Sequence, residues 1–395
     1  MTRKEFFSAG GSDRIKFVEA KALDMELVAQ LLNACRACNQ WTNFGPLNHM
    51  LADEYARHVD LDAGRRFVPC ANGGVALEAQ ARLLAASAGQ KALRWVGSAF
   101  SFKNLGRGYF ADMQFLDCDM HGMLDLAELE RLPAEGFDGV IVTNPLGMAR
   151  DFDAYIRFAE RSGKALLIDN AAGMDQTIPK WPWQAFSLHH TKPYGFGEGG
   201  LALVPAAAAE DFISLINYDH APADPSHWFN NGKLSDVACA FQIARLRQTA
   251  TWRPRYHAQH TRIGRIIRDM GLSSWHSAPD KAPATFIPVL YDTPLEAAQL
   301  KLARPVDIAR HYPPLAPRVR AAGIFSRLIS FPAHPDMEQL SDSDIRMTLA
   351  ALKPAAPRRR TTRDVSEDQT APAFGDRGAK PNHRSRASVR PGEAR

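Results

Sequence analysis

The sequence predicts an α/β protein, with a mostly parallel central sheet flanked by helices and a smaller α+β domain behind it. Two observations support this fold class. Short apolar runs alternate with segments of helical periodicity through residues 1–245. The charge density then rises, and a second set of short elements follows over residues 246–352. We therefore expect a large domain at 1–245, a small C-terminal domain at 246–352 and a tail at 353–395.

The expected elements follow in chain order. Helical periodicity covers residues 24–39 and 72–84. Apolar runs typical of buried strands lie at 92–96, 112–116, 139–143, 165–168 and 201–204, with helical patterns at 125–131 and 151–162 between several of them. In the small domain we expect strands at 285–291 and 327–331 and a helix at 341–352. The alternation of strand and helix predicts parallel strand pairs.

Composition and charge exclude several classes of function. The chain has 395 residues, 45% of them hydrophobic, which is enough for a sizeable core. Its net charge is +5, but residues 353–395 hold eleven Lys and Arg against five Asp and Glu, a surplus of six that leaves −1 on the rest. The basic character belongs to the tail, which we expect to be disordered and dispensable for turnover. A nucleic-acid-binding function is not indicated.

The sequence offers no membrane span and no metal motif. Its longest apolar runs are far shorter than the ~20 residues that a spanning helix requires. No apolar core of signal-peptide length follows the first residues, so we expect a cytoplasmic location. Cys35 and Cys38 have C-x-x-C spacing but lie in a helical pattern without a second ligand pair. We expect the five scattered cysteines to be free thiols.

The strongest chemical signal is the run SLHHTKPYGFGEGG at residues 187–200, which places Lys192 before a glycine cluster. Lys192 follows the apolar run that ends at Asp169 and precedes another, so two buried strands would bring an amine and an acid to one sheet edge. Pyridoxal phosphate chemistry needs this pair: the lysine forms an imine with the cofactor aldehyde, and the carboxylate keeps the pyridine nitrogen protonated. A surface lysine and a turn-capping aspartate are the alternatives.

A phosphate-binding turn is expected near the start of the 72–84 pattern. Gly73, Gly74 and Val75 would offer free backbone N–H groups at a helix N-terminus, where phosphate binds. Ser187, five residues before Lys192, could add a hydroxyl donor to the same phosphate. Four segments, including the aromatic one described next, would then serve one cofactor.

Four ring side chains near these motifs have competing interpretations. Phe100 offers a flat face for the pyridine ring, and Phe102 is its competitor; either could instead belong to the core. His189 and His190 could act as general bases. At alternating positions of an expected strand, at least one of them would serve packing instead.

Together these motifs resemble the DegT/DnrJ/StrS family, the nucleotide-sugar aminotransferases among fold-type-I pyridoxal phosphate enzymes. The resemblance covers most of the chain, and the motifs stand in the family's order. They are NFGP at 43–46, NGGVAL at 72–77, DCD at 117–119, DNAA at 169–172, the run at 187–200, NGKLSD at 231–236 and HYPPL at 311–315. Two positions depart from the family: Gly74 stands where Thr or Ser is usual, and Ala172 stands where Gln or His is usual.

The resemblance implies further site residues. Ala171 would lie beside the cofactor, and Asn231 would reach the phosphate from a neighbouring subunit of a homodimer with shared sites. Asn231 could otherwise be an ordinary turn residue before Gly232. On the acceptor side the resemblance implies Asn43, His311 and Tyr312. The loss of a hydroxyl at Gly74 predicts somewhat weaker cofactor retention.

The activity that the resemblance implies is transfer of an amino group from glutamate or glutamine to a nucleotide-linked keto sugar, for surface polysaccharide or secondary-metabolite sugars. Lys192 would bind the cofactor and move the proton, and Asp169 would hold the ring cationic. Two alternatives stay open. A sugar dehydratase of the same fold would carry His in place of the lysine, and a non-catalytic or regulatory member would fit the changes at Gly74 and Ala172.

Overall fold

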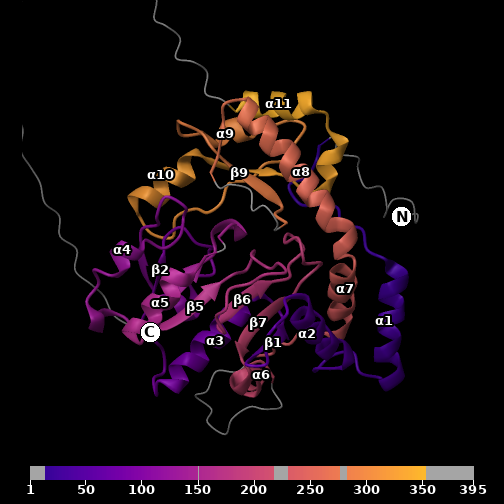
Figure 1. Ribbon diagram of the computed structural model, residues 1–395, viewed down its shortest axis with the longest axis vertical. Coiled ribbons are helices and arrows are strands. Elements are labelled where there is room, and N and C mark those ends of the chain that lie inside the picture. The colour runs from indigo at the N-terminus through magenta and orange to yellow at the C-terminus, as the bar shows by residue number, and fades with distance from the viewer. Residues whose placement is uncertain (1–13, 150, 218–229, 276–282, 353–395) are drawn as a thin grey trace, which may run out of the picture. The chain divides into compact units, whose positions relative to one another are not determined.

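The computed structural model describes residues 14–149, 151–217, 230–275 and 283–352, all of which belong to one compact unit. The tail that we expect to be disordered, 353–395, lies outside the described residues. Within them the chain forms a seven-stranded sheet and a three-stranded sheet, each covered by helices (Figure 1). The predicted α/β fold class is confirmed. The domain boundary at 245/246 stays a prediction.

The seven-stranded sheet is mostly parallel, as predicted. Its strand order is β1-β7-β6-β5-β4-β2-β3. Only β7 is antiparallel to its neighbours, β1 and β6, so the other six strands share one direction and end at one edge. The strands are β1 Arg65–Cys70, β2 Trp95–Ser98, β3 Gln114–Leu116, β4 Gly139–Thr143, β5 Ala165–Asp169, β6 Gln184–Ser187 and β7 Gly200–Pro205.

Helices cover both faces of this sheet, because successive side chains of a strand point to opposite faces. In β5, Leu167 packs into the core on the side of α3, whereas Leu166 and Ile168 pack into the core on the side of α5. In β6, Phe186 packs with α1, α2 and α7. The helices are α1 Met25–Cys38, α2 Pro46–His58, α3 Gly73–Ser87, α4 Leu126–Leu129, α5 Asp153–Ser162, α6 Ala209–Leu215 and α7 Asp236–Arg247.

The three-stranded sheet is antiparallel, with the order β10-β9-β8, and packs against α8 and α11. A segment from the other end of the chain joins this region, since Ile15 forms a parallel bridge with Val306. The elements are α8 Thr249–Asp269, β8 Ser273–Ser274, β9 Phe286–Leu290, α9 Ala297–Leu300, α10 Val319–Arg327, β10 Leu328–Pro332 and α11 Asp342–Ala351. Short 3₁₀ helices lie at Gly108–Phe110, Ala134–Gly136, Pro145–Gly147, Ala206–Ala208 and Pro335–Gln339.

Local capping explains where the helices near the site begin. The Asp24 side chain accepts the N–H of Leu27 at 3.0 Å and starts α1. The start of α2 is held from a distance, because the carboxylate of Asp236 accepts the N–H groups of Gly45, Leu47 and Asn48 at 2.8–3.2 Å. This contact fastens the NFGP turn at 43–46 to the start of α7.

Several boundaries differ from the expectations. Residues 139–143 coincide with β4, but the strand expected at 92–96 is wrong in position: β2 begins at Trp95, the first residue that pairs with β4. Strands β1 and β6 and helix α2 were not anticipated. Cys35 and Cys38 do lie in α1, and all five cysteines are free. Over the described residues no cluster of three or more potential metal ligands occurs.

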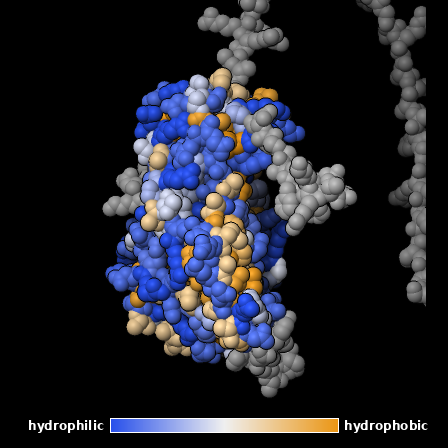
Figure 2. Space-filling view, turned by 90° about the vertical axis from the view of Figure 1, so that its right-hand side faces the viewer, coloured by the Kyte–Doolittle hydropathy of each residue, from blue (hydrophilic) through white to orange (hydrophobic). Residues whose placement is uncertain are grey.

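The surface is mainly hydrophilic on the side of α1 and α8, with an apolar strip in the lower half of that face (Figure 2). Exposed large apolar side chains include Met25 on α1, Trp41 in the turn after it and Val237 on α7. Within the described part of the chain, no helix combines the length and apolarity that crossing a bilayer would take. The cytoplasmic location stays a prediction.

Candidate active site

The predicted site residues meet at the edge where the parallel strands end, which is where open α/β sheets bind ligands. Asp169 is the last residue of β5, and Ser187 is the last residue of β6. Lys192 follows in the turn that leads from β6 to β7. The glycine turn before α3 follows β1 directly. The topology therefore brings together three segments, those that follow β1, β5 and β6.

Asp169 is a buried carboxylate with few partners. Its side chain accepts one hydrogen bond from the described chain, a long one of 3.3 Å from the Ala171 N–H. The residue is 4% exposed, and burial raises the pKa of Asp169 to about 6, although the nearby Lys192 and the Ala171 N–H oppose the shift. Beside it in the sheet register, the hydroxyl of Thr143 is buried without a partner among the described residues. Within the described residues the acid forms no ion pair, so burial outweighs the opposing effect of Lys192 on its pKa.

Lys192 is close enough to Asp169 for their charges to interact. Its side chain is half-buried, and burial lowers the pKa of Lys192, with Asp169 opposing that shift. The Lys192 N–H donates to the His189 carbonyl at 2.8 Å, and the Lys192 carbonyl accepts the Gly195 N–H at 3.0 Å. A lysine with a lowered pKa has a larger neutral fraction near pH 7, which is the form that attacks an aldehyde.

A cradle for a phosphate lies where β1, β6 and β7 meet. The Asn72 side chain caps α3 by accepting the Val75 N–H at 3.0 Å. Gly73 and Gly74 are the first two residues of α3, and their N–H groups donate to no acceptor in the described chain. A Cβ built on Gly73 would lie 3.4 Å from the Ser187 Cβ, so the Ser187 side chain begins next to this turn; its hydroxyl accepts the His189 N–H at 3.3 Å. These donors form the anion site of a helix N-terminus.

Glycine is required beside this cradle. A Cβ on Gly200, the first residue of β7, would lie 2.3 Å from the carbonyl carbon of Asn72 and 2.6 Å from the Gly73 nitrogen. No side chain fits at such distances, so the GEGG end of the 187–200 motif allows β7 to approach the phosphate turn. This gives the glycine cluster a steric reason that the sequence pattern alone did not supply.

An aromatic cluster lies at the same sheet edge, because Phe100 follows the end of β2. Phe100 is fully buried, and its ring meets those of Trp275 and Tyr312 at centroid distances of 5.3 and 5.5 Å. Its competitor Phe102 is 47% exposed.

His311 is neutral at pH 7. Burial and the positive charge of nearby Lys192 both lower the pKa of His311, to about 4.

Tyr312 packs against the Phe100 ring and lies near Asp169 at the sheet edge. Burial and the neighbouring Asp169 both raise the pKa of Tyr312, and its hydroxyl accepts the Leu146 N–H at 3.3 Å. The phenol is therefore neutral and keeps a proton that it can donate. Of the acceptor-side residues predicted, His311 and Tyr312 lie at the site.

Other predicted residues are placed differently. Asn43 is exposed in the turn before α2, and its contacts within the described residues do not reach Lys192 or Asp169. Asn231 is also exposed, and the segment that holds it runs beside its own chain's phosphate turn, because the Gly232 carbonyl accepts the Ala71 N–H at 2.6 Å. Both roles stay predictions.

The strand expected for His189 and His190 is wrong, because β6 ends at Ser187 and both histidines lie in the following turn. The His190 ring is within hydrogen-bond distance of the Glu19 carbonyl at 3.2 Å. The His189 ring contacts the Thr191 hydroxyl at 2.9 Å. The His190 contact therefore ties the turn to the segment before α1, whereas the His189 contact stays within the turn.

Ala171 and Ala172 lie in the turn that follows Asp169 at the end of β5. The Ala171 carbonyl accepts the Ser187 N–H at 3.1 Å, so this residue ties the end of β6 to the turn after Asp169. The backbone at Ala172 packs tightly, since a Cβ on Gly147 would lie 2.3 Å from its carbonyl oxygen. No polar side chain projects from position 172.

Pyridoxal phosphate fits these residues. The two free N–H groups and the serine hydroxyl suit its phosphate, the poorly partnered Asp169 suits a pyridinium nitrogen, and Lys192 suits its aldehyde. The buried Phe100 ring supplies an aromatic wall at the same edge. The donor set, the orphaned Thr143 hydroxyl and the steric cradle at Gly73 all agree with the cofactor.

The fold and this site define a pyridoxal phosphate-dependent aminotransferase. Residues 23–341 match the model of the DegT/DnrJ/EryC1/StrS aminotransferase family, and the chain belongs to that family. The predicted resemblance, the fold type, the cofactor and the enzyme class are thereby confirmed.

Solved structures share this fold at low identity. A protein from Bacillus cereus ATCC 10987 designated a PLP-dependent aminotransferase has a TM-score of 0.72 at 18% identity and covers 86% of this chain and 99% of its own. Helicobacter pylori PseC, an aminotransferase of pseudoaminic acid biosynthesis, has 0.70 at 16%, covering 85% and 97%. DesI, solved with its TDP-sugar product, has 0.69 at 17%, covering 84% and 90%.

Sequence reasoning missed the side chains that hold the Lys192 turn. They are Lys21, Gln242 and Arg245, which donate to its backbone carbonyls. In α7, Gln242 and Arg245 interrupt an otherwise apolar pattern, and a buried polar residue is the signal that could have found them. No local pattern marks Lys21.

Proposed function

We propose that the protein transfers an amino group from glutamate or glutamine to a keto sugar linked to a nucleoside diphosphate. The observation that carries this proposal is the amine of Lys192 held in the field of the buried Asp169 at the sheet edge. Family membership supports the transfer reaction, and the sugar product in the DesI structure supports the acceptor class. Surface polysaccharide or secondary-metabolite synthesis would use such a product.

The residues divide the work of the reaction. Bound pyridoxal phosphate supplies an aldehyde that takes up nitrogen and a cationic ring that accepts electrons. Asp169, once ionised opposite that ring, stabilises its positive charge. Lys192 would hold the cofactor at its aldehyde, and its amine, once released, would serve as the base for the proton on the donor's α-carbon. In the second half-reaction Lys192 returns a proton in the reverse direction.

Neutral His311 and Tyr312 are suited to the acceptor side. Because burial and Lys192 keep the imidazole uncharged, His311 does not compete with Lys192 as a cation beside the acid. Burial and Asp169 keep the Tyr312 hydroxyl protonated, so it can donate to an acceptor oxygen. We propose that these two side chains orient the keto group relative to Lys192.

The function is tested by following the visible absorbance of the yellow holoprotein through both half-reactions. We expect glutamate or glutamine to remove the band, because nitrogen passes to the cofactor. One or more members of a panel of nucleotide-linked keto sugars should then restore it within seconds. Free keto sugars and simple α-keto acids other than the donor's product serve as controls for the nucleotide.

Two outcomes would contradict the proposal. Recovery of the band with simple keto acids alone would show an amino-acid aminotransferase that does not need the nucleotide. Release of ammonia or water from the sugar without amino transfer would favour the dehydratase alternative.

We also propose a homodimer in which Asn231 reaches the partner's cofactor phosphate. Mixing a Lys192→Ala variant with an Asn231→Ala variant would then create one intact site in each heterodimer, so activity should recover to about a quarter of the wild-type level at equal mixing. Each variant alone is the control. If Asn231 serves its own chain, no heterodimer has an intact site and the mixture stays as inactive as its parts.

A further inference from the structure

The turn that carries Lys192 has no regular secondary structure over residues 188–199. Its backbone carbonyls therefore cannot all be satisfied by neighbouring N–H groups, and buried polar groups need partners. Side chains from outside the turn supply them. Gln242 on α7 donates to the carbonyls of Leu188, Phe196 and Glu198 at 2.6–3.1 Å, and Arg245 donates to that of Pro193 at 2.9 Å.

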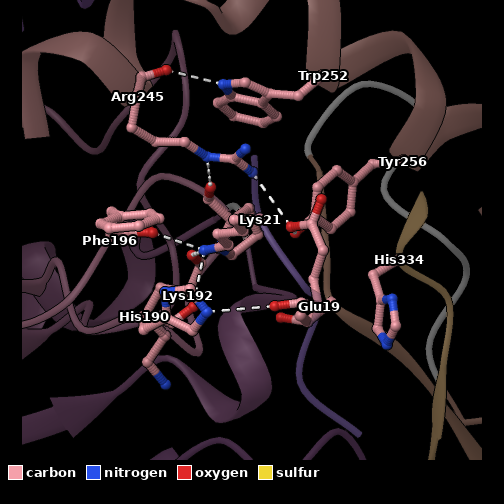
Figure 3. Close-up of polar contacts among 12 residues, drawn as sticks. Glu19, Lys21, His190, Lys192, Phe196, Arg245, Trp252, Tyr256 and His334 are labelled. Carbon is pink, nitrogen blue, oxygen red and sulfur yellow. Dashed lines mark hydrogen bonds and ion pairs between the residues drawn. The ribbon is translucent and has the colours of Figure 1, made fainter. Parts of the chain in front are cut away.

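Lys21 satisfies the carbonyls closest to the reactive lysine. Its Nζ donates to the carbonyl oxygens of His190 at 2.7 Å and Gly195 at 2.6 Å, and also to that of Lys192 itself. Figure 3 shows this amine pointing into the turn from the segment before α1. The Lys21 amine thus closes the turn around the position of Lys192 by contacting three of its carbonyl oxygens.

A buried ion pair fixes Lys21 and its neighbours. Glu19 is 5% exposed, and its carboxylate accepts from Arg245 at 3.3 Å and from the Tyr256 hydroxyl at 2.6 Å. Arg245 also lies over the Trp252 ring, 4.2 Å from its centroid. Figure 3 shows these side chains packed around Lys21, with the Lys192 side chain on the other side of the turn.

The charges near Lys21 oppose one another. Burial, Arg245 and Lys192 lower the pKa of Lys21 to about 6, while Glu19 raises it. Three carbonyl oxygens around the amine also favour the protonated form. Two of the three carbonyls, those of His190 and Gly195, have no other hydrogen-bond donor among the described residues, whereas the Lys192 carbonyl also accepts the Gly195 N–H. The arrangement is therefore sensitive to the removal of this single amine.

We propose that Lys21 is a positioning residue, which holds the 188–199 turn so that the amine of Lys192 stands at the cofactor aldehyde and over the donor's α-carbon. This inference rests on the proposed role of Lys192. Proton transfer requires the reacting atoms to be within ~3–3.5 Å, and a displacement of ~1 Å can cost ~100-fold in rate. Lys21 itself does not touch the reacting atoms in this account.

The test compares Lys21→Met with Lys164→Met in the full-length protein. Lys164 is a matched control, because its half-buried amine also ties two backbone carbonyls, those of Ala134 at 2.5 Å and Phe137 at 2.8 Å. It lies at the start of β5, at the sheet edge opposite Asp169. A lysine that serves only stability should give the same phenotype in both variants.

Two readouts distinguish positioning from stability. For Lys21→Met we expect the donor half-reaction to slow ~100-fold, with the donor concentration for half-maximal rate nearly unchanged. Hydrogen exchange of amides 188–199, measured with and without pyridoxal phosphate, should accelerate at least ~10-fold, because the turn loses the hydrogen bonds from Lys21 to its carbonyl groups. Lys164→Met should change neither. Wild-type rate and exchange in Lys21→Met would overturn the inference.

Chemical rescue adds an independent arm. Lys21→Cys treated with 2-bromoethylamine regains an amine of nearly the same length, and we expect at least half of the wild-type rate to return. Treated wild-type protein is the control, since Cys38 is exposed. A natively folded, fully modified protein that stays slow contradicts the inference. If Lys21→Met does not fold, unmodified Lys21→Cys replaces it, and a wild-type rate there also overturns the proposal.

The two proposals fail separately. If borohydride labels a residue other than Lys192, the proposed function of Lys192 is wrong whatever Lys21 does. If Lys192 is labelled and Lys21→Met behaves as wild type, only the positioning role is wrong.

Discussion

Replacing Lys192 by alanine is expected to slow amino-group transfer by ~10³-fold or more, because one side chain supplies both the amine that binds the cofactor and the base that moves the proton. Burial lowers the pKa of Lys192, so its replacement removes an amine with an increased neutral fraction. Single-turnover decay of the visible band with glutamate, after loading with excess pyridoxal phosphate, measures the effect.

His189→Ala is the control for Lys192→Ala, since His189 lies three residues before it and bonds only within the turn and to nearby Glu198. We expect the His189→Ala variant to react within ~3-fold of the wild-type rate, because the His189 imidazole takes no part in proton transfer. A Lys192→Ala protein that transfers nitrogen at the wild-type rate would exclude the proposed mechanism.

Replacing Asp169 by alanine should cost ~10³-fold in the same assay, because an uncharged ring accepts electrons poorly and no other buried acid stands at this edge of the described sheet. Ser187→Ala is the matched comparison. Ser187 offers one hydroxyl to the phosphate, so its loss should weaken cofactor binding by ~10-fold and leave the rate at saturating cofactor nearly unchanged. Equal losses in the two variants would contradict the separate roles.

Asp169 also predicts a pH-dependent stability of the cofactor-free protein. Burial raises the pKa of Asp169 to about 6 from 3.8, so the folded state binds the proton more tightly than the unfolded state. Its contribution to stability is therefore greatest at low pH and declines as pH rises from ~4 to ~6, by up to ~3 kcal/mol. Asp169→Asn removes this titration.

We therefore expect cofactor-free Asp169→Asn to exceed the wild type in free energy of unfolding above pH 6, and the two to converge below pH 4. Urea denaturation across pH 4–8 measures this difference. A wild type that is the more stable of the two at pH 8 would show that the carboxylate has a partner that the described residues do not supply. With pyridoxal phosphate bound the order should reverse, because the ring cation pairs with Asp169.

The sheet could be predicted where apolar runs were continuous. Residues 139–143 and 165–168 read as strands because both faces of their strands are buried. By contrast, β1 carries Arg65, Arg66 and Pro69, and β6 has only four residues, so neither showed a clear pattern. Their pairing is fixed by tertiary contacts with β7, which no local signal reports.

The chemical part of the site was also predictable, because Asp169, Lys192 and the glycine turn each combine a residue type with a strand end. Their support was not predictable. Lys21 binds a turn 169–174 residues away in the sequence, and Arg245 meets Glu19 across 226 residues. Such contacts leave no periodicity, and only the folded chain shows that an N-terminal lysine and α7 together hold the reactive turn.

The most direct test of the central claim is to trap the covalent link between protein and cofactor. Sodium borohydride treatment of the yellow holoprotein, followed by digestion and mass spectrometry of the peptides, should place a phosphopyridoxyl group on Lys192 alone. The mass increase should be absent from the Lys192→Ala variant prepared in the same way. A label on another lysine, or an undiminished label in the alanine variant, would contradict the account.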